Sequence, residues 1–267
     1  MQLPDPERVI YERNPLVEVI GQLRFPPILK IANADPVQLQ DAIRDDYPLL
    51  ETINNVVLIG PGNQPISEPQ KVEVTYRFSS EDLKWQVSLN KGFLSIATKG
   101  YERYEDFKQR FRKIITIFED IYKPAFYSRI GLRYQDLIIR SSLDLADEDW
   151  SALIPNHIAP ELHIPELVAD IAASTKVLMM NSGSGQVAFR HGLVEARDSG
   201  ENLIEQAYLI DADFFNEERI SGETNVWEKL DEYNHSARKL FRWSISDTLH
   251  AAMRPTPVES TNAQPED

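Results

Sequence analysis

Residues 16–25 carry the sequence LVEVIGQLRF, in which apolar and polar side chains alternate. A period of two is typical of a strand that buries one face and exposes the other. The pair Pro26-Pro27 ends the stretch, because proline cannot donate a hydrogen bond to a β-ladder. We therefore predict a strand from Leu16 to Phe25, with Arg24 on the face opposite Leu23.

The rest of the first half alternates between helical and strand-like patterns. The clearest helix runs from Tyr104 to Tyr122, where apolar side chains recur every three or four residues. A shorter helix is expected to begin with Asp35 as its cap and Pro36 in its first turn. The predicted elements are a helix over 36–47, a loop over 60–70, strands over 72–78, 84–89 and 93–98, and the long helix over 104–122.

The second half repeats this order of elements. Its opening strand contains Ile130-Gly131-Leu132-Arg133-Tyr134, which shares a Leu-Arg-aromatic core with Gly21-Gln22-Leu23-Arg24-Phe25. This agreement indicates a duplicated β-α-β-β-β-α unit. The predicted elements are a strand over 127–139, a short helix near 144–150, strands over 172–180, 186–196 and 204–215, and a closing helix over 226–253.

These patterns predict an α+β fold. Strands that bury one side form one or two curved antiparallel sheets, and the two long helices cover the apolar face. The two repeats, 1–125 and 126–254, are expected to form one compact unit. The polar residues 255–267 are expected to be a disordered tail.

The composition restricts the classes of function. Twenty-eight Lys and Arg stand against 42 Asp and Glu, for a formal charge of -14, which disfavours general nucleic-acid binding. The absence of cysteine excludes disulfides and thiolate metal sites. Short apolar runs and an opening without a signal-peptide pattern lead us to expect no membrane span and a cytoplasmic location.

One pair of carboxylates is a candidate metal site. Asp211 and Asp213 stand two apart on a predicted strand and therefore share a face. Mg²⁺ and Mn²⁺ prefer oxygen ligands, so the pair is compatible with metal-assisted hydrolysis of phosphoesters. The alternative is that both are surface acids, as an acidic chain is expected to have.

Two sets of basic residues are candidate binding sites. The segment 99–113 is locally basic and could contact an anion or a nucleic-acid strand, unless its cations pair with acids along the helix. Arg24 and Arg133 occupy matching positions in the two repeats, and could contact one partner or pair across strands. The candidate binding residues are Arg24, Arg133, Lys108, Arg110, Arg112 and Lys113.

The opening of the chain resembles a known protein family. Asn14-Pro15-Leu16-Val17-Glu18-Val19, followed by Leu23-Arg24-Phe25-Pro26, is similar to the first motif of a sporadically distributed, uncharacterised prokaryotic family of similar length. The resemblance brings no activity or catalytic residues with it. The patchy distribution of that family implies an accessory gene, such as one at a defence or toxin-linked locus.

Known catalytic motifs are absent from the sequence. It contains neither of the glycine-rich phosphate-binding loops, nor the G-x-S-x-G elbow of serine hydrolases. We therefore expect a non-enzymatic binding protein without a cofactor, which holds a protein partner or a small ligand and is free to form a homodimer. The alternatives are a metal-dependent hydrolase or nuclease using Asp211 and Asp213, and anion or nucleic-acid binding through 99–113.

Overall fold

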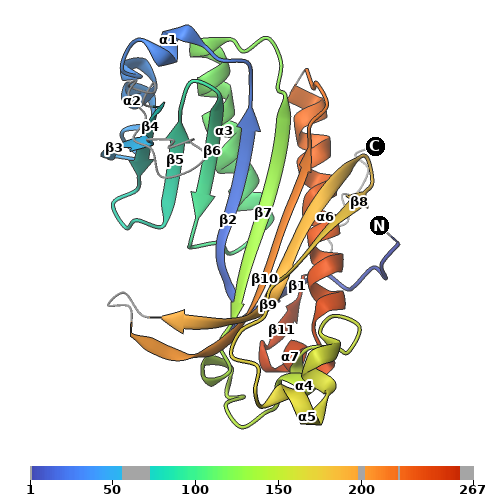
Figure 1. Cartoon of the computed structure of the whole chain (residues 1–267). Helices are drawn as coiled ribbons and strands as arrows, with labels where there is room; N and C mark the ends of the chain where they lie inside the picture. Colours follow the sequence, from blue (N-terminus) through green and yellow to red (C-terminus); the bar gives the residue numbers. More distant parts are fainter. Residues whose placement is uncertain (1, 56–72, 198–201, 222, 259–267) are drawn as a thin grey trace, which may run out of the picture. The chain divides into compact units, whose positions relative to one another are not determined.

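The computed structural model describes residues 2–55, 73–197, 202–221 and 223–258 (Figure 1). Over these residues the chain is an α+β protein with antiparallel sheets, as predicted. The strands are β1 (Val9–Tyr11), β2 (Leu16–Arg24), β3 (Leu49–Asn55), β4 (Glu73–Ser79), β5 (Trp85–Leu89), β6 (Phe93–Thr98), β7 (Arg129–Ile138), β8 (Lys176–Ser182), β9 (Gly185–Arg197), β10 (Leu203–Asn216) and β11 (Pro255–Pro257). The α-helices are α1 (Leu29–Ala32), α2 (Val37–Ile43), α3 (Tyr104–Tyr122), α4 (Trp150–Leu153), α5 (Pro165–Val168), α6 (Glu223–Ser244) and α7 (Asp247–Ala252).

Nine strands share one hydrogen-bonded order, β3-β4-β5-β6-β2-β7-β10-β9-β8, and β1 pairs with β11 separately. The alternation predicted for β2 is confirmed, because Val19 and Leu23 are buried whereas Arg24 is exposed. Leu23 lies opposite Leu94 of β6 in this ladder. The apolar side of β2 therefore faces the core, and Arg24 lies on the other face.

The predicted strands of the first half are confirmed within one or two residues, and two further strands, β1 and β3, were not predicted. The turn between β5 and β6 is closed by the Asn90 side chain, which accepts hydrogen bonds from the backbone N–H groups of Gly92 and Phe93 at 2.8 and 2.9 Å. The sequence patterns missed β3, which pairs along its whole length with β4. The predicted loop at 60–70 lies outside the described residues.

The long helix α3 has the predicted bounds. Two other helix predictions need correction. The closing helix is instead two helices, because Ser246 caps a new helix by accepting the N–H of Leu249 at 3.1 Å. Asp35 does not cap α2, since its carboxylate accepts the hydroxyl of Tyr76 at 2.8 Å and Pro36 occupies the cap position.

The segment predicted to be a disordered tail begins with an ordered strand. Residues 255–257 form β11 and pair antiparallel with β1, with Val9 opposite Pro257. Further backbone bonds extend this pairing, from the N–H of Glu12 to the carbonyl of Arg254 and from Arg13 to Met253. Residues 259–267 lie outside the described residues.

The chain divides into two compact units, and each combines segments from both predicted halves. Unit 1 comprises Met1–Val17, Tyr134–Phe214 and Glu232–Asp267. Unit 2 comprises Glu18–Arg133 and Phe215–Asp231.

The core of unit 2 forms where α3 approaches β2. A Cβ atom at Gly21 would stand 2.6 Å from a ring carbon of Phe111, closer than two carbons can approach. The missing side chain of Gly21 therefore lets the helix lie against the strand. Phe107 also contacts this position, and Phe118 of α3 packs on Phe25 with ring centroids 4.8 Å apart.

The core of unit 1 includes polar groups that find partners inside it. Tyr233 of α6 packs on Phe214 of β10, and Tyr134 of β7 donates its hydroxyl hydrogen to Asn234 at 2.9 Å. His191 of β9 is buried and hydrogen-bonds the Tyr208 hydroxyl at 2.7 Å. Burial, aided by the nearby Lys176, lowers the pKa of His191 to about 4, so this histidine is a neutral core residue at pH 7.

Candidate functional site

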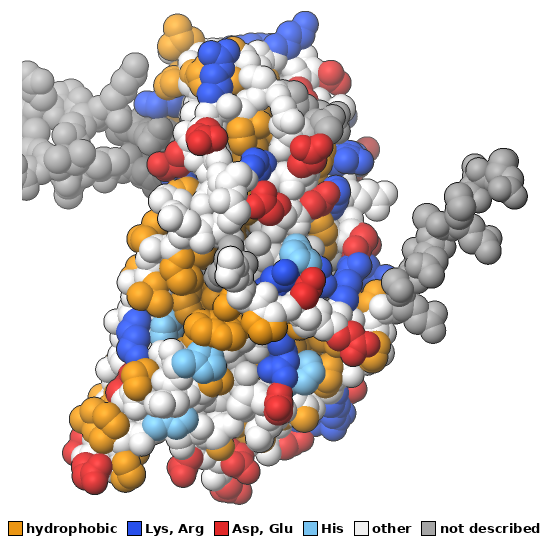
Figure 2. Space-filling view, turned by 90° about the vertical axis from the view of Figure 1, so that its right-hand side faces the viewer, with side chains coloured by type: hydrophobic (Ala, Val, Ile, Leu, Met, Phe, Trp, Pro, Cys, Tyr) orange, Lys and Arg blue, Asp and Glu red, His pale blue; other side chains and the backbone are white. Residues whose placement is uncertain are grey.

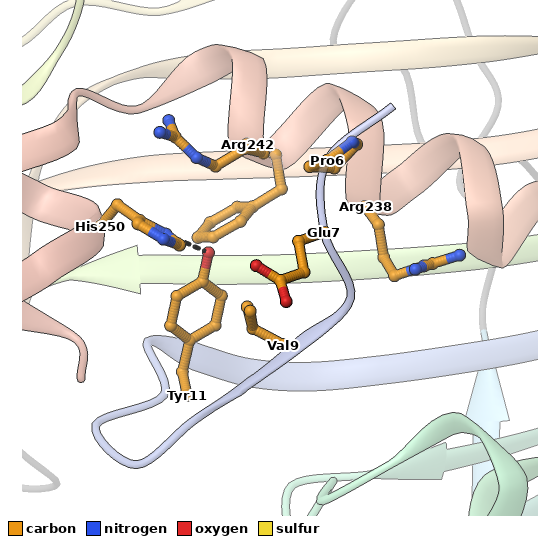
Figure 3. Close-up of a pocket in the computed structure, with 8 residues that line it drawn as sticks. Pro6, Glu7, Val9, Tyr11, Arg238, Arg242 and His250 are labelled. Atoms are coloured by element: carbon orange, nitrogen blue, oxygen red, sulfur yellow. Dashed lines mark hydrogen bonds between the residues drawn. The ribbon is translucent and has the colours of Figure 1, made fainter. Parts of the chain in front are cut away.

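Unit 1 contains a pocket between the N-terminal segment and the last helices. Its volume is about 310 Å³, at the lower end of the range of small-molecule sites. Aromatic, aliphatic and charged side chains converge on it. The lining residues are Pro6, Glu7, Val9, Tyr11, Arg238, Phe241, Arg242 and His250 (Figure 3).

Local structure explains why these residues meet. The β1–β11 ladder holds the N-terminal segment beside the residues that follow α7. Arg242, near the end of α6, forms an ion pair with Asp247 and donates to the carbonyl of Ile245 at 3.3 Å. These two bonds link the end of α6 to the residues that lead into α7. The short α7 can then bring His250 to the pocket.

Tyr11 and His250 form a hydrogen-bonded pair at one end of the pocket. The Tyr11 hydroxyl lies 2.9 Å from Nδ1 of His250, and Phe241 packs edge-on against the Tyr11 ring (Figure 3). Burial raises the pKa of Tyr11 to about 12, and burial together with the positive charge of Arg242 lowers the pKa of His250. Both groups are therefore uncharged at pH 7 and supply hydrogen bonds rather than charge.

Arg238 is the principal cation of the pocket. Its guanidinium donates to Nδ1 of His235 at 2.9 Å, and its Nε is buried without a hydrogen-bond partner in the part of the chain that the structure describes. Within the same residues, Arg238 has no ion pair with a carboxylate. An arginine stays protonated at any physiological pH. Arg238 therefore brings to the lining a positive charge that forms no ion pair with a carboxylate of the described residues, although Glu7 lines the same pocket.

Carboxylates accompany both arginines of the pocket. Arg242 stands one helical turn after Arg238, but Asp247 already pairs with it. Glu7 is exposed, and Figure 3 shows its side chain between Tyr11 and Arg238. Two arginines thus stand with two carboxylates, Glu7 at the lining and Asp247 paired with Arg242, and these charges balance.

The structure places the predicted metal pair in unit 1, with the two acids in unlike surroundings. Asp211 is only 3% exposed and lies 3.8 Å from Nη1 of Arg190, whereas Asp213 is half-buried. The neighbouring buried acid is Asp136 of β7. No group of three or more His, Cys, Asp or Glu side chains placed to hold a metal ion occurs in the described ranges. The two-carboxylate metal site stays a prediction.

Most cations of the basic segment have partners within unit 2. Lys108 contacts both carboxylate oxygens of Asp231 at 2.7 Å, and Lys113 pairs with Asp46 at 2.6 Å. Two cations also lie over the ring of Trp227. Nζ of Lys108 is 5.8 Å and Cζ of Arg112 is 4.9 Å from the ring centroid. The acidic partners of Lys108 and Lys113 lie outside α3, and not along the helix as the alternative from the sequence supposed. The proposed anion site at 99–113 stays a prediction.

Arg110 contacts two aromatic side chains of unit 2. The Arg110 guanidinium stacks 4.7 Å from the centroid of Trp85, and it also hydrogen-bonds Tyr47. Burial raises the pKa of Tyr47, and the bond to Arg110 opposes that rise. Arg110 thus holds α3 against its neighbours in unit 2.

Arg24 and Arg133 lie on the face of their strands away from the core of unit 2. The residues beside them in the alternation, Leu23 and Leu132, are fully buried. Arg24 donates to Gln22 at 3.1 Å, and the buried Arg129 donates to the same amide oxygen at 3.3 Å. The predicted face is therefore confirmed, and Arg129 is a third arginine on it that the repeat comparison missed.

The pocket was missed at the level of sequence for a simple reason. Arg238 and Arg242 are four residues apart and share a helix face, which is a visible pattern. Their partners Tyr11 and His250 are 239 residues apart in the chain. No periodicity relates such distant segments.

The comparisons with known proteins leave the function open. No protein-family model matches the chain, and no curated protein is similar to it. No helix within the described ranges is long and apolar enough to cross a membrane.

Proposed function

We propose that this protein is a non-enzymatic binding protein whose pocket takes a small ligand with one acidic group and an apolar body. The guanidinium of Arg238, which lines the pocket without forming an ion pair with a carboxylate of the described residues, supports this proposal most directly. A guanidinium with a free donor recognises a carboxylate or a phosphate oxygen through charge-assisted hydrogen bonds. Val9, Tyr11 and Phe241 offer the apolar contact area beside it.

The roles of the other lining residues follow from their chemistry. The neutral Tyr11–His250 pair can exchange donor and acceptor roles, and so bonds either a hydroxyl or a carbonyl of the ligand. Glu7, exposed at the lining, repels a second negative charge. The preferred ligand is therefore a monoanion. The pocket volume of about 310 Å³ limits it to a small molecule.

Ligand binding can be tested with benzoate as the probe. Benzoate joins one carboxylate to an aromatic ring, and we expect it to raise the melting temperature of the wild-type chain, because a ligand that binds only the folded state stabilises it. Arg238→Gln should abolish the rise. Arg44→Gln, at an exposed arginine just after α2 and outside the pocket, is the matched control and should keep the rise.

Inorganic phosphate separates charge from shape in the same assay. It carries the anion without the apolar body, and we expect a smaller shift than with benzoate. Equal shifts in wild type and Arg238→Gln would contradict the proposal, as would no shift with any aromatic or aliphatic monocarboxylate.

The metal-dependent hydrolase or nuclease is an alternative proposal. Alternation along β10 supports it, because Asp211 and Asp213 then project to the same side. The nearby Arg190 weakens it, since a cation already faces Asp211. Mn²⁺ titration distinguishes the two: a stabilisation that is lost in Asp211→Asn/Asp213→Asn would favour the metal site.

We further infer that the two halves are duplicates, and that the chain belongs to the prokaryotic family whose opening motif it resembles. The strand order supports duplication. β2 opens the first half and is followed outward in the sheet by β6, β5 and β4, and β7 opens the second half and is followed outward by β10, β9 and β8. Within unit 2 the helix α3 packs on β2, and within unit 1 Tyr233 of α6 packs on Phe214 of β10, as expected of long helices that each cover strands. An accessory role at a defence or toxin-linked locus rests on the family resemblance alone.

A further inference from the structure

Glu7 is the one carboxylate among the residues that line the pocket. Within the residues that the structure describes, its carboxylate has neither an ion pair nor a hydrogen bond, and the side chain is exposed. Figure 3 shows the Glu7 side chain between Tyr11 and Arg238, with its carboxylate directed toward Tyr11. A ligand in this pocket therefore meets a negative group as well as the guanidinium of Arg238.

Two lining charges of opposite sign are left without an ionic partner. Arg242 is paired with Asp247, so its charge is already balanced. Arg238 and Glu7 form no ion pair with each other, nor with any other side chain in the described ranges. A ligand that carries only an acidic group can pair with Arg238, but it then lies close to the like charge of Glu7. A ligand that also carries a cationic group can pair with both residues.

The charge of the whole chain also favours a ligand without net charge. The formal charge of -14 repels a small anion that approaches the surface. Figure 2 shows Lys and Arg side chains interspersed with Asp and Glu side chains on one face of the molecule, so the described residues of that face offer no broad basic region to offset this repulsion. A zwitterion has no net charge and is not repelled.

We propose that the ligand is an amino acid with an apolar side chain, whose carboxylate pairs with Arg238 and whose ammonium group pairs with Glu7. This inference rests on the proposed function. It keeps the single acidic group and the apolar body, and it adds one amine. Val9 and Phe241 of the lining are the residues that contact the apolar side chain of the ligand.

The pair of Tyr11 and His250 suits an ammonium group beside Glu7. When the Tyr11 hydroxyl donates to Nδ1 of His250, its oxygen keeps lone pairs that can accept a hydrogen bond from the ligand. An ammonium group has three N–H donors. It can therefore bond the carboxylate of Glu7 and the hydroxyl of Tyr11 at the same time.

Three ligands with one carbon skeleton separate the two charges. Free phenylalanine carries both groups, hydrocinnamate carries only the carboxylate, and phenethylamine carries only the ammonium group. In calorimetric titrations of the full chain we expect phenylalanine to bind most tightly, roughly fivefold more tightly than hydrocinnamate, as one partly exposed ion pair allows. Phenethylamine should bind most weakly, because it leaves Arg238 without a partner.

Two variants then match each group of the ligand to its residue. In Glu7→Gln, phenylalanine should lose its advantage over hydrocinnamate, because the partner of its ammonium group is gone. In Arg238→Gln, the affinity for both carboxylates should fall. The matched control is Glu12→Gln, at an exposed carboxylate of the same N-terminal segment that pairs with Arg254 and does not line the pocket. It should keep the wild-type order of the three ligands.

The outcomes separate a failure of this inference from a failure of the proposed function. If hydrocinnamate binds through Arg238 and phenylalanine binds no more tightly, the amino-acid ligand is excluded and the acidic ligand is retained. The same conclusion follows if the advantage of phenylalanine persists in Glu7→Gln. If neither carboxylate binds in a way that depends on Arg238, both proposals are overturned.

Discussion

Asp136 of β7 and Asp211 of β10 are two buried carboxyl groups on neighbouring strands, close enough for the charge of one to affect the other. Burial is the larger cause and the negative charge of Asp211 the smaller, and together they raise the pKa of Asp136 to about 8. In the unfolded chain the pKa of Asp136 returns to the ordinary value of 3.8. The two states therefore hold different numbers of protons between these pH values.

The first prediction concerns Asp136→Asn. Between pH 4 and pH 8 the folded state keeps the proton that the unfolded state loses, so the contribution of Asp136 to stability falls as pH rises. The amide resembles the protonated carboxyl, and we expect the variant to match wild type near pH 4 and to exceed it near pH 8. The gain should be several degrees in melting temperature, at about 2–4 °C for each kcal/mol.

Thermal unfolding over pH 4 to 8 measures this difference directly. The exposed Asp149→Asn is the control, and its difference from wild type should not grow with pH. A constant difference for Asp136→Asn would show that Asp136 is ionised in the folded protein.

The second prediction concerns Tyr11→Phe. The substitution removes the hydroxyl that bonds His250 and leaves the ring contacts with Phe241 in place. A lost hydrogen bond of this kind costs about 1 kcal/mol, and more if His250 finds no replacement partner. Because Tyr11 ends β1, amide exchange of β1 and β11 should accelerate. The control is Tyr122→Phe, at a partly buried tyrosine of α3. It should change neither the free energy of unfolding by that amount nor the amide exchange of β1 and β11.

The third prediction concerns the ion pair of Lys108 and Asp231. Lys108 is only 26% exposed and bonds both oxygens of Asp231, so we expect a double-mutant cycle with alanine to give a coupling of about 1 kcal/mol. The pair Asp41–Arg44 on the surface of α2 is the reference, at about 0.3 kcal/mol. Equal couplings in the two cycles would mean that Lys108 is held mainly by Trp227.

The fourth prediction concerns Gly183 in the turn between β8 and β9. Its φ is +57°, and an added Cβ would overlap the Glu232 carboxylate. Gly183→Ala should destabilise the protein by roughly 1–3 kcal/mol, as expected for strain at a left-handed position with a clash. Adding Glu232→Ala should recover part of this loss. Gly92→Ala meets no atom closer than 3.9 Å and should be nearly neutral.

Sequence patterns predicted those elements that bury one regular face. β2 and α3 are examples, because Val19 and Leu23 of the strand, and Phe107 and Phe111 of the helix, recur with the period of their backbone. The break between α6 and α7 was missed because the apolar pattern continues through it, and the Ser246 cap is a local hydrogen bond.

Short strands and the pocket were beyond such patterns. β11 reads Pro-Thr-Pro, and two prolines argue against a strand unless it has a single partner and an open edge. Its partner β1 is three residues long and lies at the other end of the sequence. Three residues are too few to show a strand-like alternation of apolar and polar side chains. Both β1 and the pocket that it helps to line form through contacts between segments far apart in the sequence, which local patterns do not reveal.

The β1–β11 ladder has a consequence for the order of events during synthesis. Tyr11 leaves the ribosome early, whereas His250 and β11 follow it by more than two hundred residues. The Tyr11 side chain must wait, without its partner, while both compact units acquire most of their residues. Ligand binding at this pocket would therefore mark a chain that has been translated through α7, and chains cut short before that helix would fail to bind.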